Sequence, residues 1–147
     1  MSYANTTDLE ERLGEGIYLQ LTDDAGTGSA DEGKASEALE QAEGEVNSYL
    51  ARRYAVPVDV SVDAQLAAIL KSVTLDLAEY RLHARRPPIP EDKRRQREAA
   101  VRWLGQASSG QVVLPAVNEV QGHTVCGISG EVTGSPRVIS REALERL

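Results

Sequence analysis

The residues of this chain that are best suited to bind an anion form a group of bases within residues 85–97. They are Arg85, Arg86, Lys93, Arg94, Arg95 and Arg97. Such a group can neutralise phosphates, but no aromatic side chain lies among these bases to stack on nucleobases. The pattern favours a solvated or protein-binding face, and phosphate binding is the weaker alternative.

Other residue types that can support catalysis are present but poorly spaced. His83 and His123 have no ligand-like spacing to Asp, Glu or Cys, and Cys126 has no Lys or Arg beside it in sequence to activate its thiol. Gly26 and Gly28 are not followed by the GK[ST] sequence of a phosphate-binding loop. We therefore expect no enzyme activity, no metal and no cofactor.

Charge is segregated along the chain, whose net charge is −7. Residues 1–50 contain twelve acids and two bases, whereas residues 51–102 contain eleven bases and seven acids. This separation suggests complementary surfaces, within the fold or between copies, unless both are simply solvated helix faces. The negative total opposes sequence-specific DNA binding. No apolar run approaches the ~20 residues that span a bilayer, so no membrane partner is expected.

The elements that must position these charges are predicted to be helices, because apolar residues recur at three or four positions. Thr6 or Thr7 is expected to cap a short first helix, which carries Leu9, Leu13 and Ile17 on one face. A second begins at a capping box formed by residues 29–32 and continues to Tyr54.

Residues 46–57 organise the predicted fold, since they end the second helix and break it at Pro57. Arg52 and Arg53 fall outside the apolar stripe of that helix and are expected to face water or a partner. Three acids also lie away from the stripe centre. They are Glu37, Glu40 and Glu43.

A third helix, at about residues 64–86, is the most apolar and is the expected core. Leu66, Ile69, Leu70, Val73, Leu77 and Tyr80 form its main face, and Leu75 and Leu82 form a second row. A fourth helix begins at Glu91 and stops at Gly110 in a left-handed C-cap.

From Ala116 the composition changes to glycine, valine, threonine and serine without helical periodicity until residue 140. We predict a helical body at 1–110 and an extended C-terminal arm at 111–147. The arm is either disordered in the free protein or becomes ordered on a neighbour.

Several stretches, taken in order, resemble the Mu-like phage protein family thought to join head and tail. The similar stretches are 3–14, 19–23, 42–57, 77–82, 99–104 with Gly110, and an ending in which Arg137, Ser140 and Arg141 form Arg-x-x-Ser-Arg. Together they span most of the chain.

This resemblance implies a mainly α fold, a four-helix connector-type bundle, acting as a structural head-completion adaptor. Such an adaptor would form a ring, usually of twelve subunits, beneath the portal protein, and would meet further neck or tail-completion proteins. It would belong to the virion neck and be present in the host cytoplasm during assembly. DNA would pass its hole transiently and without specificity, so Glu37, Glu40 and Glu43 are the candidate channel lining.

Portal or neighbour contacts are expected at two places on the chain. The candidates are Arg52, Arg53, Arg137, Val138, Ile139, Ser140, Arg141, Leu144 and Leu147. The main alternative is a small helical nucleic-acid-binding or regulatory module that uses Lys93, Arg94, Arg95 and Arg97. A stand-alone enzyme would need a pocket that converges on His83 or His123.

Overall fold

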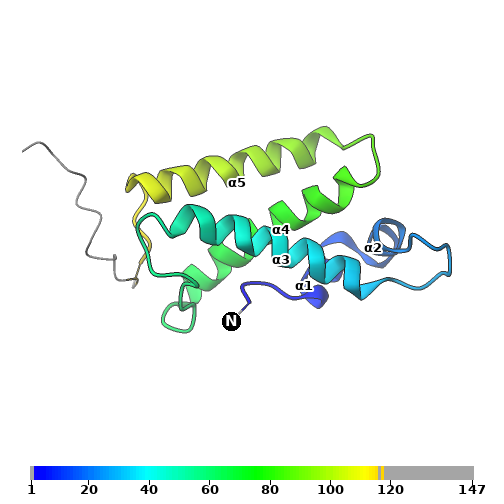
Figure 1. Cartoon of the computed structure of the whole chain (residues 1–147), viewed down its shortest axis with the longest axis horizontal. Coiled ribbons are helices and arrows are strands. Elements are labelled where there is room, and N and C mark those ends of the chain that lie inside the picture. Colours follow the sequence, from blue (N-terminus) through cyan, green and yellow to red (C-terminus); the bar gives the residue numbers. More distant parts are fainter. Residues whose placement is uncertain (1, 116, 118–147) are drawn as a thin grey trace, which may run out of the picture.

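The described part of the chain folds into five helices that form one elongated body (Figure 1). The computed structural model describes residues 2–115 and 117, and within them there is no β-strand. The predicted mainly α fold is confirmed. The body contains five helices instead of four because the first predicted helix is divided in two.

The N-terminal region is a pair of short helices. α1 spans Thr6–Leu13 and α2 spans Glu15–Thr22. They are separated at Gly14, whose φ of 79° lies in the region that favours glycine. The break turns Ile17 out of the predicted apolar seam and leaves it 47% exposed, whereas Leu21 is buried.

The caps of two helices lie beside the predicted positions. Asn5 caps α1, because its side-chain oxygen accepts a hydrogen bond from the Asp8 N–H at 2.8 Å. α3, Glu32–Leu50, follows Asp31, whose carboxylate accepts a hydrogen bond from the Gly33 N–H at 2.9 Å. Asn and Asp are at least as effective as Ser or Thr in this role. The predicted caps at Thr6 or Thr7 and at Ser29 were therefore wrong.

α3 buries the small and branched side chains of the predicted stripe. These are Ala35, Ala38, Leu39, Ala42, Val46 and Leu50. The helix ends at Leu50 and not at Tyr54, yet Tyr54 is only 1% exposed. Its hydroxyl accepts a hydrogen bond from the Leu114 N–H at 3.2 Å. A turn, not a continued helix, keeps Tyr54 in the core.

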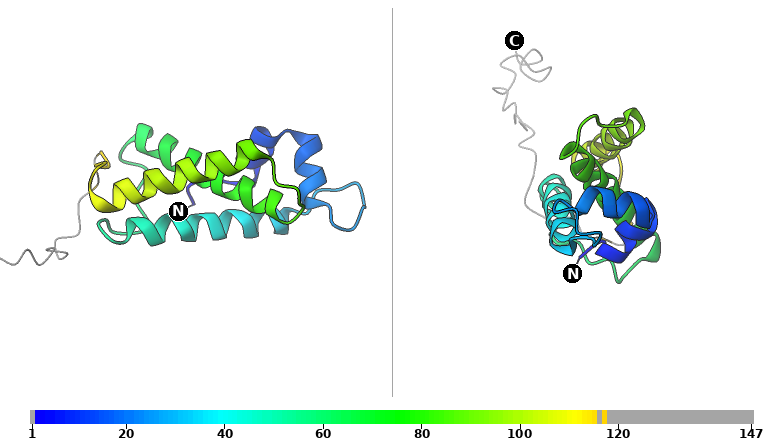
Figure 2. Two further views of the ribbon diagram at one scale, coloured as in Figure 1. Left: turned by 90° about the horizontal axis from the view of Figure 1, so that it is seen from above. Right: turned by 90° about the vertical axis from the view of Figure 1, so that its right-hand side faces the viewer.

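α4, Ala64–Ala84, contacts each of the other four helices and lies at the centre of the body (Figure 2). Most of the two predicted apolar rows is buried, including Leu70 and Leu77 on one and Leu75 and Leu82 on the other, whereas Tyr80 is only partly buried. Ile69 is 39% exposed and lies outside the core. Burial on more than one side makes α4 the core helix, as its wide apolar arc predicted.

α5, Glu91–Ser109, ends at Gly110 in the predicted left-handed conformation, with φ 81°. The chain then turns back, so that Leu114 is 2% exposed and packs in the core. The first residues of the predicted arm thus contact the body. The rest of that arm, at 116 and 118–147, lies outside the described residues.

Candidate interaction surfaces

Two ion pairs fasten α1 to the middle of α4. Asp8 Oδ1 lies 2.5 Å from Lys71 Nζ, and Arg12 pairs with Asp76. Desolvation acts to raise the pKa of Asp8, but hydrogen bonds from Lys71 and the Asn5 N–H hold that pKa below its ordinary value. At Asp76 desolvation outweighs the attraction of Arg12 and raises the pKa. The contact between α1 and α4 is therefore ionic as well as apolar.

A second group of ion pairs joins the loop after α2 to the end of α4. Asp24 pairs with Arg85, and its Oδ1 lies 3.0 Å from Arg86 Nη2. Arg86 also donates a hydrogen bond to the Asp23 carbonyl at 2.7 Å. The hydrogen bond from Arg86 is the main cause that lowers the pKa of Asp24. The acidic first third and the basic middle of the chain thus meet within the fold at these positions.

Glu79 on α4 is a buried carboxylate between two cations from other helices. Its side chain is 1% exposed, with Oε1 2.8 Å from Arg12 Nε and Oε2 2.7 Å from Lys93 Nζ. The three side chains come from α4, α1 and α5, so they link three helices. This buried carboxylate could have been predicted from the sequence, because Glu79 lies between Leu75 and Leu82 on the second apolar row.

Arg97 of the predicted anion-binding group is also paired within the chain, as is Arg81 of α4. Glu45 lies 2.6 Å from Arg81 and 3.5 Å from Arg97, measured between carboxylate oxygen and guanidinium nitrogen. The Arg97 guanidinium carbon also lies 4.9 Å from the centroid of the Tyr80 ring. These pairs reduce the positive charge that phosphate could meet. They weigh against a nucleic-acid-binding module that uses the α5 face.

The two predicted partner-binding arginines after α3 have different surroundings. Arg52 is exposed, whereas Arg53 is only partly exposed and its guanidinium lies against Gly110. A Cβ atom added to Gly110 would come within 1.4 Å of Arg53 Nη1. Glycine at 110 therefore serves both the left-handed turn and the approach of Arg53. Other predicted partner residues lie outside the described part: Arg137, Val138, Ile139, Ser140, Arg141, Leu144 and Leu147.

The three candidate lining acids of α3 do not share one direction. Each step of three residues rotates the side chain by about 300° around the helix, so successive acids differ by about 60°. Glu37 and Glu40 are exposed, whereas Glu43 is partly buried and accepts a hydrogen bond from the Ser2 Oγ–H at 2.9 Å. Glu37 faces solvent, and Glu43 faces the N-terminal segment.

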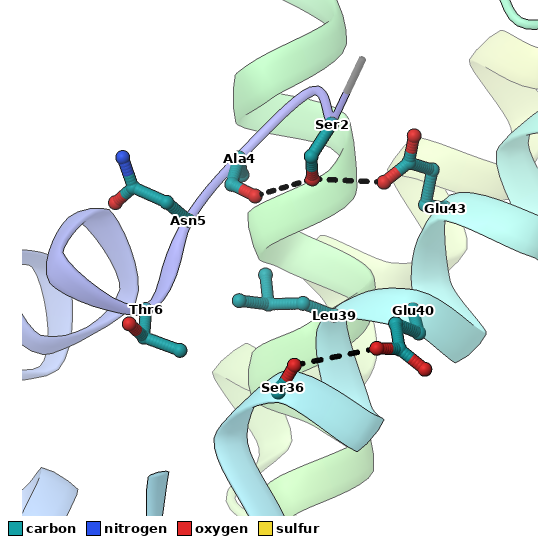
Figure 3. A pocket seen from close by; sticks show the side chains of 8 residues that line it. All are labelled: Ser2, Ala4, Asn5, Thr6, Ser36, Leu39, Glu40 and Glu43. Atoms are coloured by element: carbon teal, nitrogen blue, oxygen red, sulfur yellow. Dashed lines mark hydrogen bonds between the residues drawn. The ribbon is translucent and has the colours of Figure 1, made fainter. Parts of the chain in front are cut away.

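A groove separates the N-terminal segment from α3 (Figure 3). We call it the N-terminal groove, and its volume is about 490 Å³. One wall contains Ser2, Ala4, Asn5 and Thr6, and the other contains Ser36, Leu39, Glu40 and Glu43. Ser36 Oγ–H donates a hydrogen bond to Glu40 at 3.4 Å, a long contact. The groove thus combines two carboxylates and several hydroxyls with a small apolar part at Leu39 and Ala4.

The residues considered for catalysis gain little support from their surroundings. His83 lies in the last turn of α4, where burial and then the charge of Lys93 lower its pKa. His123 and Cys126 lie outside the described residues. Within 2–115 and 117, no three metal-ligating side chains gather in a cluster. No helix in the same part of the chain is long and apolar enough to cross a membrane.

The fold and these surfaces define a small helical protein whose buried charges bind its own helices together. The chain belongs to the family described as Bacteriophage Mu, Gp36, whose sequence profile matches residues 3–125. A relative from Haemophilus influenzae, the Mu-like prophage FluMu protein gp36, is 30% identical over 112 residues, covering 76% of this chain and 74% of the relative. The resemblance to Mu-like phage proteins is confirmed, and it indicates a phage structural or assembly protein.

Proposed function

We propose that this protein is a head-completion adaptor of a tailed phage, which forms a ring beneath the portal protein and joins head to tail. The family match covers the entire helical body and supports the phage context. The proposal of an acidic DNA channel is supported by one observation on α3. Glu37 and Glu40 have no cation partner within the described residues.

The proposed role is mechanical. The body packs beside copies of itself, as a ring of twelve, and meets the portal and further neck or tail-completion proteins. Its site is the virion neck after assembly in the host cytoplasm. Arg52 and the arm residues 137–147 supply the contacts with portal or neighbour. No catalysis or cofactor is part of this role.

An acidic channel lets DNA pass because it repels phosphates at short range instead of holding them. Of the three candidate acids, Glu37 and Glu40 have the exposure that a lining requires. Glu43 is turned toward Ser2 and would lie at the edge of such a lining.

Glu37→Lys is expected to slow or block DNA ejection from otherwise complete particles, because a lysine in the channel binds phosphate. The folded state should be unchanged, since Glu37 is exposed and its one hydrogen bond within the described part of the chain is accepted from Gln41 at 3.2 Å. DNA release from purified particles is the measurement. Glu11→Lys, at an exposed position on α1, is the matched control. Normal ejection by the Glu37→Lys particles would remove this residue from the lining.

The adaptor role itself is tested by truncation after Val117, which retains every residue that packs in the described core. The shortened protein should keep its helical circular dichroism and cooperative melting. It should fail to bind a purified portal ring when both are imaged by electron microscopy, while the full chain forms rings on the portal. A full-length protein that stays monomeric with the portal, and that binds DNA in a salt-sensitive way, would overturn the proposal in favour of the regulatory alternative.

A further inference from the structure

Glu43 differs from the other partly buried carboxylates within the described helices. Asp8, Glu45, Asp76 and Glu79 each have a lysine or arginine within ion-pair distance. Among residues 2–115 and 117, Glu43 has only the Ser2 hydroxyl as a bonding partner, although it is also partly buried. A carboxylate withdrawn from water is stabilised by a cation. The N-terminal groove therefore has a place for a cation that the described residues do not supply.

The lining of the groove also suits a short peptide in an extended conformation. Ser2, Asn5 and Ser36 offer hydroxyl and amide groups that can bond a peptide backbone, while Leu39 and Ala4 give an apolar part (Figure 3). Glu40 lies one helical turn from Glu43 on the same wall. A complementary segment would carry two cations on either side of apolar residues.

We propose that the N-terminal groove binds residues 137–141 of this chain's own C-terminal segment. That segment reads Arg-Val-Ile-Ser-Arg, with Arg137 and Arg141 on either side of Val138 and Ile139. The two arginines meet Glu40 and Glu43, and the branched side chains meet the apolar part of the groove. Arginine suits this site because its planar guanidinium can bond a carboxylate with two N–H groups.

The chain is long enough for this contact. Val117 packs on the core, and Leu114 is bonded to Tyr54 just beyond the end of α3. Arg137 follows Val117 by 20 positions in the sequence, and a flexible chain of that length spans about 25 Å on average. Glu43 lies seven residues before Leu50, about 10 Å along the helix. The segment can reach the groove of its own copy or of a neighbour.

This inference deepens the proposed function and rests on it in one respect, namely that the C-terminal segment is an assembly arm. Docking on a neighbouring copy would link subunits through Glu40 and Glu43. It would take Glu40 out of the channel lining that we propose and leave Glu37 in it. Docking within one copy would store the arm on its own body.

Disulfide trapping in the full chain tests the contact. In a Cys126→Ser background, Ser36→Cys is combined with Ser140→Cys, and Thr6→Cys with Ser140→Cys samples the opposite wall. Under mild oxidation, a cross-link from either wall should form at least about tenfold faster than from Ser48→Cys, because docking raises the local concentration of the thiols. Ser48 is exposed on α3 away from the groove. Mass spectrometry identifies the joined peptides, and either a linked monomer or a linked oligomer supports the proposal.

The second measurement tests whether the carboxylates of the groove contribute to docking. Neutralising the groove by Glu40→Gln with Glu43→Gln should lower the cross-linking rate about fivefold, as expected for two partly exposed ion pairs. Glu10→Gln with Glu11→Gln, which alters two exposed acids of α1 outside the groove, should leave the rate unchanged. Equal rates from Ser36→Cys, Thr6→Cys and Ser48→Cys in folded protein would overturn the proposal. If such a protein still completes heads and joins tails, the adaptor role stands and only the occupant of the groove is refuted.

Discussion

Leu77→Ala is expected to lower the free energy of unfolding by about 2–5 kcal/mol. The leucine is 1% exposed on the helix that contacts every other helix of the body. Its loss removes apolar burial and leaves a cavity that the packed helices fill only in part. Leu70→Ala, at a fully buried position on the same face, should give a loss of similar size. Urea denaturation followed by circular dichroism measures both.

Ile69→Ala is the matched control, because Ile69 lies on the same helix but is 39% exposed. Its effect should stay within about 0.5 kcal/mol, as for most surface substitutions. If Leu70→Ala and Leu77→Ala leave the denaturation midpoint where Ile69→Ala leaves it, α4 is not the folding core.

α4 and α5 could be predicted well from the sequence because each has a long helical period and a clear stop. Pro87 cannot continue a regular helix, and Gly110 readily adopts the left-handed conformation that ends one, so both ends fell close to their predicted positions. Ile69 was wrongly placed in the core because periodicity gives the direction of a face but not how far the neighbouring helices cover it.

The N-terminal break was missed for a different reason. A single glycine costs a helix about 1 kcal/mol, so Gly14 could have been tolerated or could have ended the helix. Whether the helix ends at Gly14 depends on how Leu13 and Leu21 pack against α3 and α4. Such tertiary packing cannot be predicted from the local sequence. The surroundings of Arg53 could not be predicted for the same reason. Its position against Gly110 follows from the turn after Leu50 and from the end of α5.

For the charged sites, the sequence predicted that complementary surfaces exist but not which residues pair. Segregation of acids and bases predicted complementary surfaces, and several pairs do form within the fold. The partners themselves could not be assigned, because Arg12 and Glu79 are brought together only when α1 packs on α4. The N-terminal groove was missed likewise, since its walls come from two separate stretches of the chain.

Glu79→Gln is expected to destabilise the protein by about 3 kcal/mol, near the lower end of the range for breaking a buried ion pair. The substitution keeps the shape of the side chain but removes the charge that compensates Arg12 and Lys93. Those two side chains are 28% and 21% exposed, so they are withdrawn from water but not completely. Glu91→Gln is the control, because its pair with Arg95 is exposed on both sides, at 68% and 76%, and should matter little.

A double-mutant cycle shows whether the loss comes from the unpaired cation. Lys93→Met removes one of the two cations, and Arg12 keeps Asp76 as its partner when Glu79 is changed. Glu79→Gln combined with Lys93→Met should therefore cost less than the sum of the two single changes, by at least about 1 kcal/mol. The free energy of unfolding of all four proteins, measured at one pH and one salt concentration, gives this coupling. If the two losses simply add, or if Glu79→Gln costs no more than Glu91→Gln, Glu79 does not hold α1 and α5 to α4 by its charge, and apolar packing alone joins the three helices.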